Sequence, residues 1–165
     1  MRWIPASALD TWASTQIGRA EVARLVGKLI WATAPSLNSF RFPAGDASEI
    51  PGFDGHLITP NELVHPYVPA GESVWEFATD QDYFGRAQKE YAKRTTRPGS
   101  IDPLQCTFVF VTPRIWKRAD PTLINWEKEK RGDEKWGNVT VLDAVKLEHW
   151  LEEREAVAKD FAREV

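Results

Sequence analysis

The chain of 165 residues is 42% hydrophobic and 27% charged, which suits one globular domain and argues against a disordered chain. Its formal net charge of −3 provides no overall positive field for nucleic acid, and no apolar run approaches the ~20 residues of a membrane span. Cys106 is the single cysteine, which excludes an intrachain disulfide and a cysteine-based zinc site and favours a reducing, cytoplasmic location.

Hydrophobic periodicity and turn residues predict helices and strands that alternate over much of the chain. Helices are expected at residues 7–14, 18–33, 79–95, 122–131 and 143–161. Strands are expected at residues 56–59, 74–77, 106–111 and 137–142, with the proline-rich stretches 40–54 and 60–71 as loops. Thr79 and Asp82 have the spacing of a helix N-cap and its third residue, which predicts that the third helix is capped by Thr79.

This order predicts an α/β fold with one central mixed sheet of about four to five strands, flanked by helices on both sides. Helical crossovers imply that some strands pair in parallel. We expect a single domain over 1–165, with N-terminal helices over 1–35, the sheet core and site over 36–142, and a C-terminal helix over 143–165. The chain ends within a charged helical pattern, which fits the N-terminal module of a longer protein with a fused sensor domain.

Two carboxylates interrupt apolar surroundings and form the first candidate site. Asp54 lies in the segment PGFDG, and Glu76 lies in the next predicted strand, VWEF. Neighbouring strands can bring these side chains together, and two carboxylates form a hard oxygen site suited to Mg²⁺ or Mn²⁺. The alternative is that Asp54 is a turn residue before Gly55 and that Glu76 faces solvent.

A basic stretch follows the second carboxylate and could form a local cationic surface, although the net charge of the chain is negative. Arg86, Lys89 and Lys93 share one face of the predicted helix. Phosphodiester cleavage needs such a surface, because cations hold the nucleic-acid backbone while a metal ion serves the chemistry. The alternative is a solvated helix face. The residues assigned to nucleic-acid binding are Arg86, Lys89, Lys93, Arg94, Arg97, Arg114 and Lys117.

Five segments resemble, in order, the restriction-endonuclease-like domains of the PD-(D/E)xK superfamily, in the Mrr-like subgroup found in bacterial anti-phage defence proteins. They are FRFPAGDASEIPGFDG, PAGESVWEF, GRAQKEYAKRT, TFVFVTPRIW and VTVLDAVKLEHWLE, and the resemblance runs over roughly residues 20–160. The resemblance implies a restriction-endonuclease-like fold in which Asp54 and Glu76 bind the metal. It implies an endonuclease that hydrolyses DNA with a metal-activated water. An acid on the preceding helix sometimes joins the metal site, and Glu21 is the candidate, although it could equally be a first-turn acid favoured by the helix dipole.

The sequence departs from the superfamily pattern at Ala78, because the pattern needs a lysine two residues after the glutamate. Relatives with this pattern place the lysine in the next helix, in a KAN..Y..RT-like stretch. The matching position is Arg86, with Lys89 one turn further on and Gln88 at the asparagine-like position. Arginine can stabilise phosphate charge but cannot act as a base. Either Lys89 or Arg86 has taken the role of the lysine, or the domain is an inactive nuclease-fold module that binds nucleic acid or a protein partner.

A third hypothesis is a structural subunit that oligomerises through exposed tryptophans such as Trp116 and Trp136. The histidines do not add a catalytic motif, since His56, His65 and His149 have no ligand partner at helical spacing. His56 lies on the same side of its strand as Asp54, and a structural role is the favoured interpretation.

Overall fold

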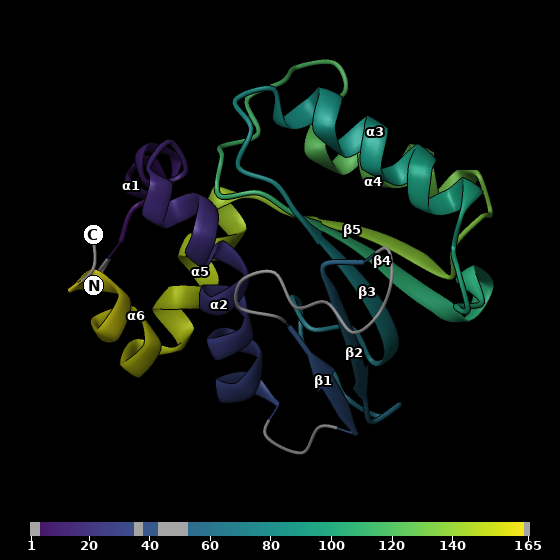
Figure 1. The fold of residues 1–165 in the computed structure, drawn as a ribbon, viewed down its shortest axis with the longest axis horizontal. Coiled ribbons are helices and arrows are strands. Elements are labelled where there is room, and N and C mark those ends of the chain that lie inside the picture. Colours follow the sequence, from purple (N-terminus) through teal and green to yellow (C-terminus); the bar gives the residue numbers. More distant parts are fainter. Residues whose placement is uncertain (1–3, 35–37, 43–52, 164–165) are drawn as a thin grey trace.

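A computed structural model describes residues 4–34, 38–42 and 53–163 (Figure 1). In this part of the chain, a five-stranded mixed sheet is flanked by six α-helices, an α/β arrangement consistent with a restriction-endonuclease-like fold. The helices are α1 (Ala6–Trp12), α2 (Gln16–Thr33), α3 (Tyr83–Thr96), α4 (Leu123–Gly132), α5 (Ala144–Glu153) and α6 (Glu155–Ala162). The strands are β1 (Ser39–Arg41), β2 (Gly55–Thr59), β3 (Gly71–Phe77), β4 (Cys106–Val111) and β5 (Asn138–Leu142), and a short 3₁₀ turn spans Pro103–Gln105.

The strands follow one another across the sheet in the order β1-β2-β3-β4-β5. The first three strands pair antiparallel, whereas β3, β4 and β5 pair in parallel, which confirms the predicted parallel pairing. In the β2–β3 pair Gly55 lies opposite Trp75. This register brings Asp54, directly before β2, alongside Glu76 in β3.

The hydrophobic core lies on both faces of the sheet. Helices α1, α2, α5 and α6 cover one face and α3 and α4 cover the other (Figure 1). All residues of β4 are buried, as its continuous apolar pattern predicts: Val109 and Val111 pack on the first side, and Phe108 and Phe110 on the second. The same alternation in β3 turns Trp75 toward the first layer and leaves Val74 and Glu76 facing the α3 layer.

Side-chain caps explain where most helices begin. Asp143 and Thr122 accept hydrogen bonds from main-chain N–H groups of α5 and α4. The predicted start of α3 is wrong. Asp82, and not Thr79, is the N-cap, with Asp82 Oδ1 2.9 Å from the Gly85 nitrogen. A Cβ at Gly85 would lie 2.2 Å from Asp82 Oδ2, so glycine leaves the space that this cap occupies.

Three further expectations need correction. Strand β1 lies in a stretch predicted as loop, and Phe40 of β1 packs on Trp31 of α2 with ring centroids 5.0 Å apart. The C-terminal helix is two helices, interrupted at Arg154, whose Nε donates to Thr33 Oγ1. Trp116 and Trp136 are only 8% and 4% exposed, so they offer no tryptophan surface for oligomerisation.

No helix formed by the described residues combines the length and apolar composition that a bilayer span requires.

Candidate functional site

Asp54 and Glu76 lie together where β2 begins and β3 ends. The main chain fixes Asp54 twice, because its N–H donates to the Trp75 carbonyl at 3.1 Å and its Oδ2 accepts from the Phe77 N–H at 2.9 Å. Glu76 occupies the face of β3 that packs under α3 and is 2% exposed. The structure thus places side by side the two carboxyl groups that the sequence singles out.

The environment of Glu76 favours its protonated form. Burial raises the pKa of Glu76 from 4.5 to about 9, and the Asp54 carboxyl group adds to the rise through a hydrogen bond and through its charge. Arg94 acts in the opposite direction and lowers this pKa. The net effect is that Glu76 holds a proton at neutral pH in the protein without a metal ion, so that proton must leave before the carboxylate can bind one.

Arg94 is the cation that reaches the carboxyl pair. Its Nε lies 2.5 Å from Glu76 Oε1, and its guanidinium carbon lies 5.3 Å from the centroid of the Phe53 ring. The Arg94 side chain is 13% exposed, so it points into the protein from the last turn of α3. Arg94 was expected to contact nucleic acid. Its position makes it the partner of Glu76, whereas Arg86 and Lys89 were the residues expected to replace the missing lysine.

Glu90 links Arg94 to Arg86 along the inner side of α3. Arg86 Nε lies 3.0 Å from Glu90 Oε1, and Arg94 Nε lies 3.9 Å from Glu90 Oε2. Arg86 also lies 3.6 Å from Asp80, in the loop before α3. A row of alternating acidic and basic side chains therefore runs from Asp80 through Arg86, Glu90 and Arg94 to Glu76. Sequence reasoning missed Glu90, although its spacing of four residues from both arginines is the signal of such a row.

The remaining residues predicted on α3 face outward or support the fold. Lys89, Lys93 and Arg97 are exposed, four residues apart on one stripe of the helix. Gln88 accepts a 2.6 Å hydrogen bond from the indole nitrogen of Trp126, which joins α3 to α4. The cationic surface of α3 is therefore the lysine and arginine stripe, and Gln88 lies away from the carboxyl pair.

Glu21 does not complete the metal site. It lies on α2, 3.7 Å from Arg24, and lines a small cavity with Trp12 and Phe161 on the other side of the sheet. Within the described ranges 4–34, 38–42 and 53–163, no three His, Cys, Asp or Glu side chains gather as a metal site. The prediction that Glu21 is a third metal ligand is wrong, because α2 packs on the sheet face opposite to Glu76.

Arg114 and Lys117, also assigned to nucleic-acid binding, differ in their surroundings. Arg114 is 8% exposed, and its guanidinium donates to the Thr79 carbonyl, to Asp10 and to Ser14 Oγ. It ties α1 to the end of the sheet, so most of its donors serve the fold. Lys117 is exposed, and its main-chain N–H donates to the Tyr83 hydroxyl group.

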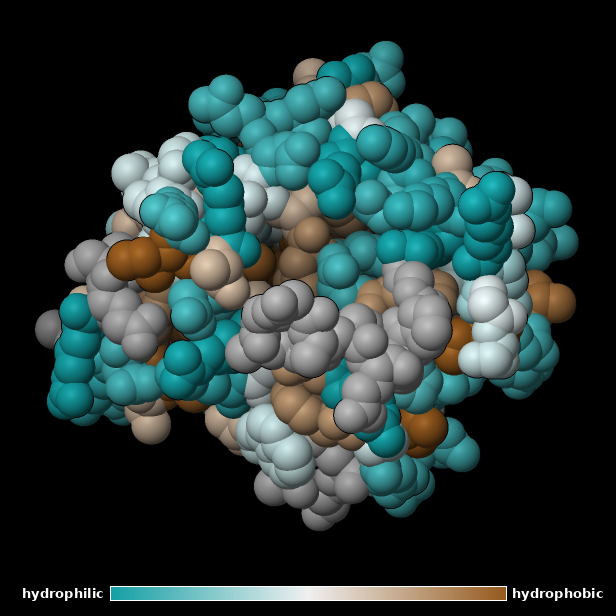
Figure 2. All heavy atoms as spheres, viewed as in Figure 1, coloured by the Kyte–Doolittle hydropathy of each residue, from teal (hydrophilic) through white to brown (hydrophobic). Residues whose placement is uncertain are grey.

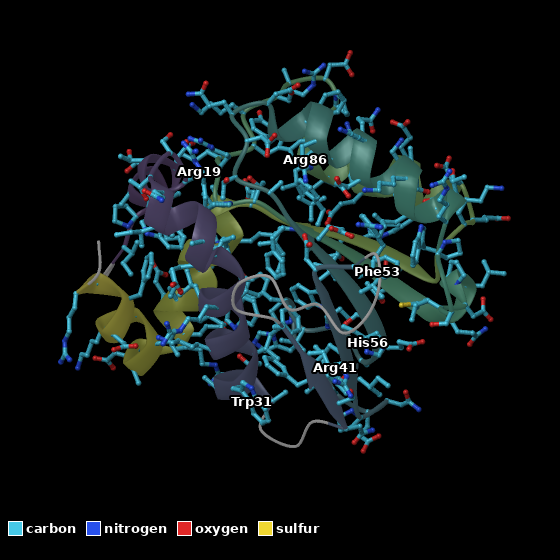
Figure 3. The ribbon with its side chains drawn as sticks, in the orientation of Figure 1. Arg19, Trp31, Arg41, Phe53, His56 and Arg86 are labelled. Carbon is cyan, nitrogen blue, oxygen red and sulfur yellow. The ribbon has the colours of Figure 1, made fainter. Side chains whose placement is uncertain are left out.

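His56 has a structural partner on the sheet. Its Nε2 lies 2.8 Å from Glu72 Oε2, at the opposite end of β3 from Phe77. Figure 3 labels His56 on the sheet. This pairing agrees with the structural role favoured for the residue.

Comparison with known proteins adds no relative to this picture. No family model matches the chain, and no curated protein sequence or solved structure matches it at a significant level. The resemblance to restriction-endonuclease-like domains therefore depends on the ordered residue pattern and on the fold described above.

Proposed function

We propose that this domain is a Mg²⁺-dependent DNA endonuclease of the PD-(D/E)xK kind that acts in bacterial anti-phage defence. The observation that carries the proposal is the pairing of Asp54 with Glu76 on adjacent strands of a restriction-endonuclease-like sheet. Mg²⁺ is bound in proteins by one or two carboxylates and keeps several waters, so this pair fits its donor requirement. Mn²⁺ accepts the same hard oxygen ligands.

The side chains have separable roles in this proposal. Asp54 and Glu76 would hold the ion, which supplies Lewis-acid activation of the phosphodiester and of water when it is bound. Arg94 orients the Glu76 carboxylate and places positive charge beside the reacting phosphate. The exposed stripe of Lys89, Lys93 and Arg97 holds the DNA backbone without reading its sequence.

A second candidate function is a nuclease-fold module that binds nucleic acid or a protein without cleavage. Two observations favour it: Arg94 already pairs with Glu76, and Ala78 stands where the superfamily pattern has lysine. An arginine that keeps its proton at every accessible pH cannot serve as a general base. The two functions share the fold and the cationic stripe. They differ in whether Glu76 can give up its proton and its contact with Arg94 in order to bind a metal ion.

Plasmid cleavage separates the two functions. Supercoiled DNA is incubated with Mg²⁺ or Mn²⁺ and with wild type, Asp54→Asn, Glu76→Gln or Glu72→Gln. Glu72 is the matched control, because it lies on the same strand but pairs with His56. The nuclease proposal expects cleavage by wild type and Glu72→Gln and a loss of at least about 100-fold in the other two, since a lost metal ligand weakens binding and charge stabilisation. Equal background nicking in all four proteins would exclude the nuclease and leave the binding module.

A further inference from the structure

A groove of about 590 Å³ opens at the ends of the parallel strands β3 and β4. Ser14 and Arg19, around the α1–α2 junction, form one wall, and the loop 79–82 before α3 forms the other. Figure 2 shows that hydrophilic side chains prevail on the surface over α3, and Figure 3 labels Arg19 near the α1–α2 junction and Arg86 on α3. Open α/β sheets commonly bind ligands beyond the carboxyl ends of their strands, which makes this groove the first place to look.

Arg114 gives the groove a rigid cationic centre. Its Nε donates to the Thr79 carbonyl at 2.9 Å, and its Nη1 donates to Ser14 Oγ at 2.9 Å and to the Asp10 carbonyl at 2.9 Å. The residue thus bridges the two walls. Within the described part of the chain its Nη2 makes no hydrogen bond, and Arg114 lines the groove. A guanidinium held in this way offers donors to an anion at little further cost in side-chain entropy.

Arg19 adds a second guanidinium to the lining of the groove. It is exposed, and its Nη2 donates to the Ser14 carbonyl at 3.2 Å. It also lies close to the N-terminus of α2, where the helix dipole disfavours positive charge. The stability of α2 therefore gives no reason for a cation here, whereas a phosphate in the groove does.

The acidic residues of the opposite wall are already engaged. Asp80 lies 3.6 Å from Arg86, and Asp82 Oδ1 accepts the Gly85 N–H as the cap of α3. Arg19, in contrast, has only a main-chain oxygen as its partner among the described residues. Arg114 is paired with Asp10, whose Oδ1 lies 3.1 Å from its Nη1, so Arg19 is the arginine of the groove that no described acidic side chain engages.

We infer that this groove binds a backbone phosphate of a nucleic-acid strand, with Arg19 and the Nη2 of Arg114 as the donors. This inference rests on the proposed function. Thr79 follows Glu76 by three residues, a reach of at most ~11 Å of extended chain, so a strand held here passes close to the carboxyl pair. The groove extends the cationic stripe of α3 with a phosphate site from a different layer of the fold.

The test measures binding without metal, so that it does not depend on cleavage. Fluorescence anisotropy in EDTA follows a labelled single-stranded and a labelled duplex oligonucleotide over a series of salt concentrations. The variants are Arg19→Ala, Gln81→Glu and Gln81→Lys, since Gln81 is exposed on the facing wall. Arg24→Ala is the matched control: it lies on the same helix, is 56% exposed and pairs with Glu21 outside the groove. Arg114 is left intact because it holds α1 in place.

We expect Arg19→Ala to weaken binding about five- to tenfold and to reduce the slope of log K against log[salt] by about 0.7–0.9, the value for one lost phosphate contact. Gln81→Glu should weaken binding, Gln81→Lys should strengthen it, and Arg24→Ala should bind as wild type does. Unchanged binding by Arg19→Ala, an equal loss in Arg24→Ala, or no binding by wild type would overturn the inference. Competition by millimolar inorganic phosphate at constant ionic strength would reassign the groove to a small phosphorylated ligand. If the variants bind in this pattern but the wild-type protein does not cleave DNA, the nuclease proposal is wrong and the phosphate site is supported.

Discussion

The guanidinium of Arg94 and the carboxyl group of Glu76 meet between α3 and β3, with Arg94 Nε 2.5 Å from Glu76 Oε1. Glu76 is 2% exposed, so the contact lies almost wholly out of water. The position two residues after Glu76 is Ala78, which is buried and packs in the core between the sheet and α3. The positive charge beside Glu76 therefore comes from the helix and not from the strand.

Replacing Arg94 tests how much this contact stabilises the fold. Arg94→Ala leaves Glu76 without its cation in a buried place, and removing one partner of a buried pair costs about 3–5 kcal/mol. We expect a loss near the lower end of that range, because Glu76 can stay protonated. Urea unfolding measures the free energy. The neighbouring exposed variant Lys93→Ala should change it by less than about 0.5 kcal/mol. Arg94→Ala that unfolds at the wild-type urea concentration would contradict the expectation.

The raised pKa of Glu76 predicts how stability depends on pH. Its pKa is about 9 in the folded protein and near 4.5 otherwise, so the folded state holds the proton more tightly. This contribution to stability is complete below pH ~4.5 and is lost as the pH rises through about 9. Glutamine has no such proton to lose. The free energies of unfolding of Glu76→Gln and wild type are compared in EDTA. The value for the variant minus the value for wild type should therefore increase between pH 5 and 9, by at most about 1.4 kcal/mol per pH unit.

The exposed variant Glu129→Gln serves as the control for this pH series, because its carboxylate is 60% exposed. Its free energy of unfolding should follow that of wild type at each pH. If the curves of Glu76→Gln and wild type ran parallel from pH 5 to 9, the carboxyl group of Glu76 would be ionised throughout, and the pairing with Asp54 would need another explanation.

Local signals in the sequence predicted most of the sheet, and the clearest of them is the continuously apolar pattern of β4. Strand β1 escaped prediction. It has three residues, and its position depends on the contact of Phe40 with Trp31, which no local pattern reveals.

In the candidate site, too, the features that depend on local sequence could be predicted, and those that depend on tertiary packing could not. Asp54 and Glu76 could be paired from the sequence, because two successive strands with a loop between them pair as neighbours. The direction of Arg94 could not, since the rotation of α3 is set by the packing of Ala87 and Tyr91 on the sheet. The burial of Arg114 likewise depends on Asp10, which is distant in the sequence.

Arg114 is predicted to be essential for the packing of α1. Its guanidinium makes hydrogen bonds to Thr79, Asp10 and Ser14, and hydrogen bonds to a charged group contribute about 1.5–3 kcal/mol each when buried. Arg114→Ala should lower the free energy of unfolding by about 3 kcal/mol, because the Asp10 carboxylate also loses its cation. Limited proteolysis should then cut near the α1–α2 junction. Lys117→Ala, which removes an exposed cation close by, should leave both measurements at wild-type values. Equal stability of the two variants would contradict this role.

Metal binding is predicted to release a proton from Glu76. A carboxylate must be deprotonated to bind a metal ion, and burial beside Asp54 raises the pKa of Glu76 to about 9. At pH 7 each bound Mn²⁺ should therefore displace close to one proton, and the affinity should rise by up to about tenfold per pH unit between pH 6 and 8. Titration calorimetry in buffers of different ionisation enthalpy counts the protons. Glu76→Gln should abolish the release and weaken binding, whereas Glu72→Gln should retain both. Tight Mn²⁺ binding by wild type with no proton released would contradict the protonated pair.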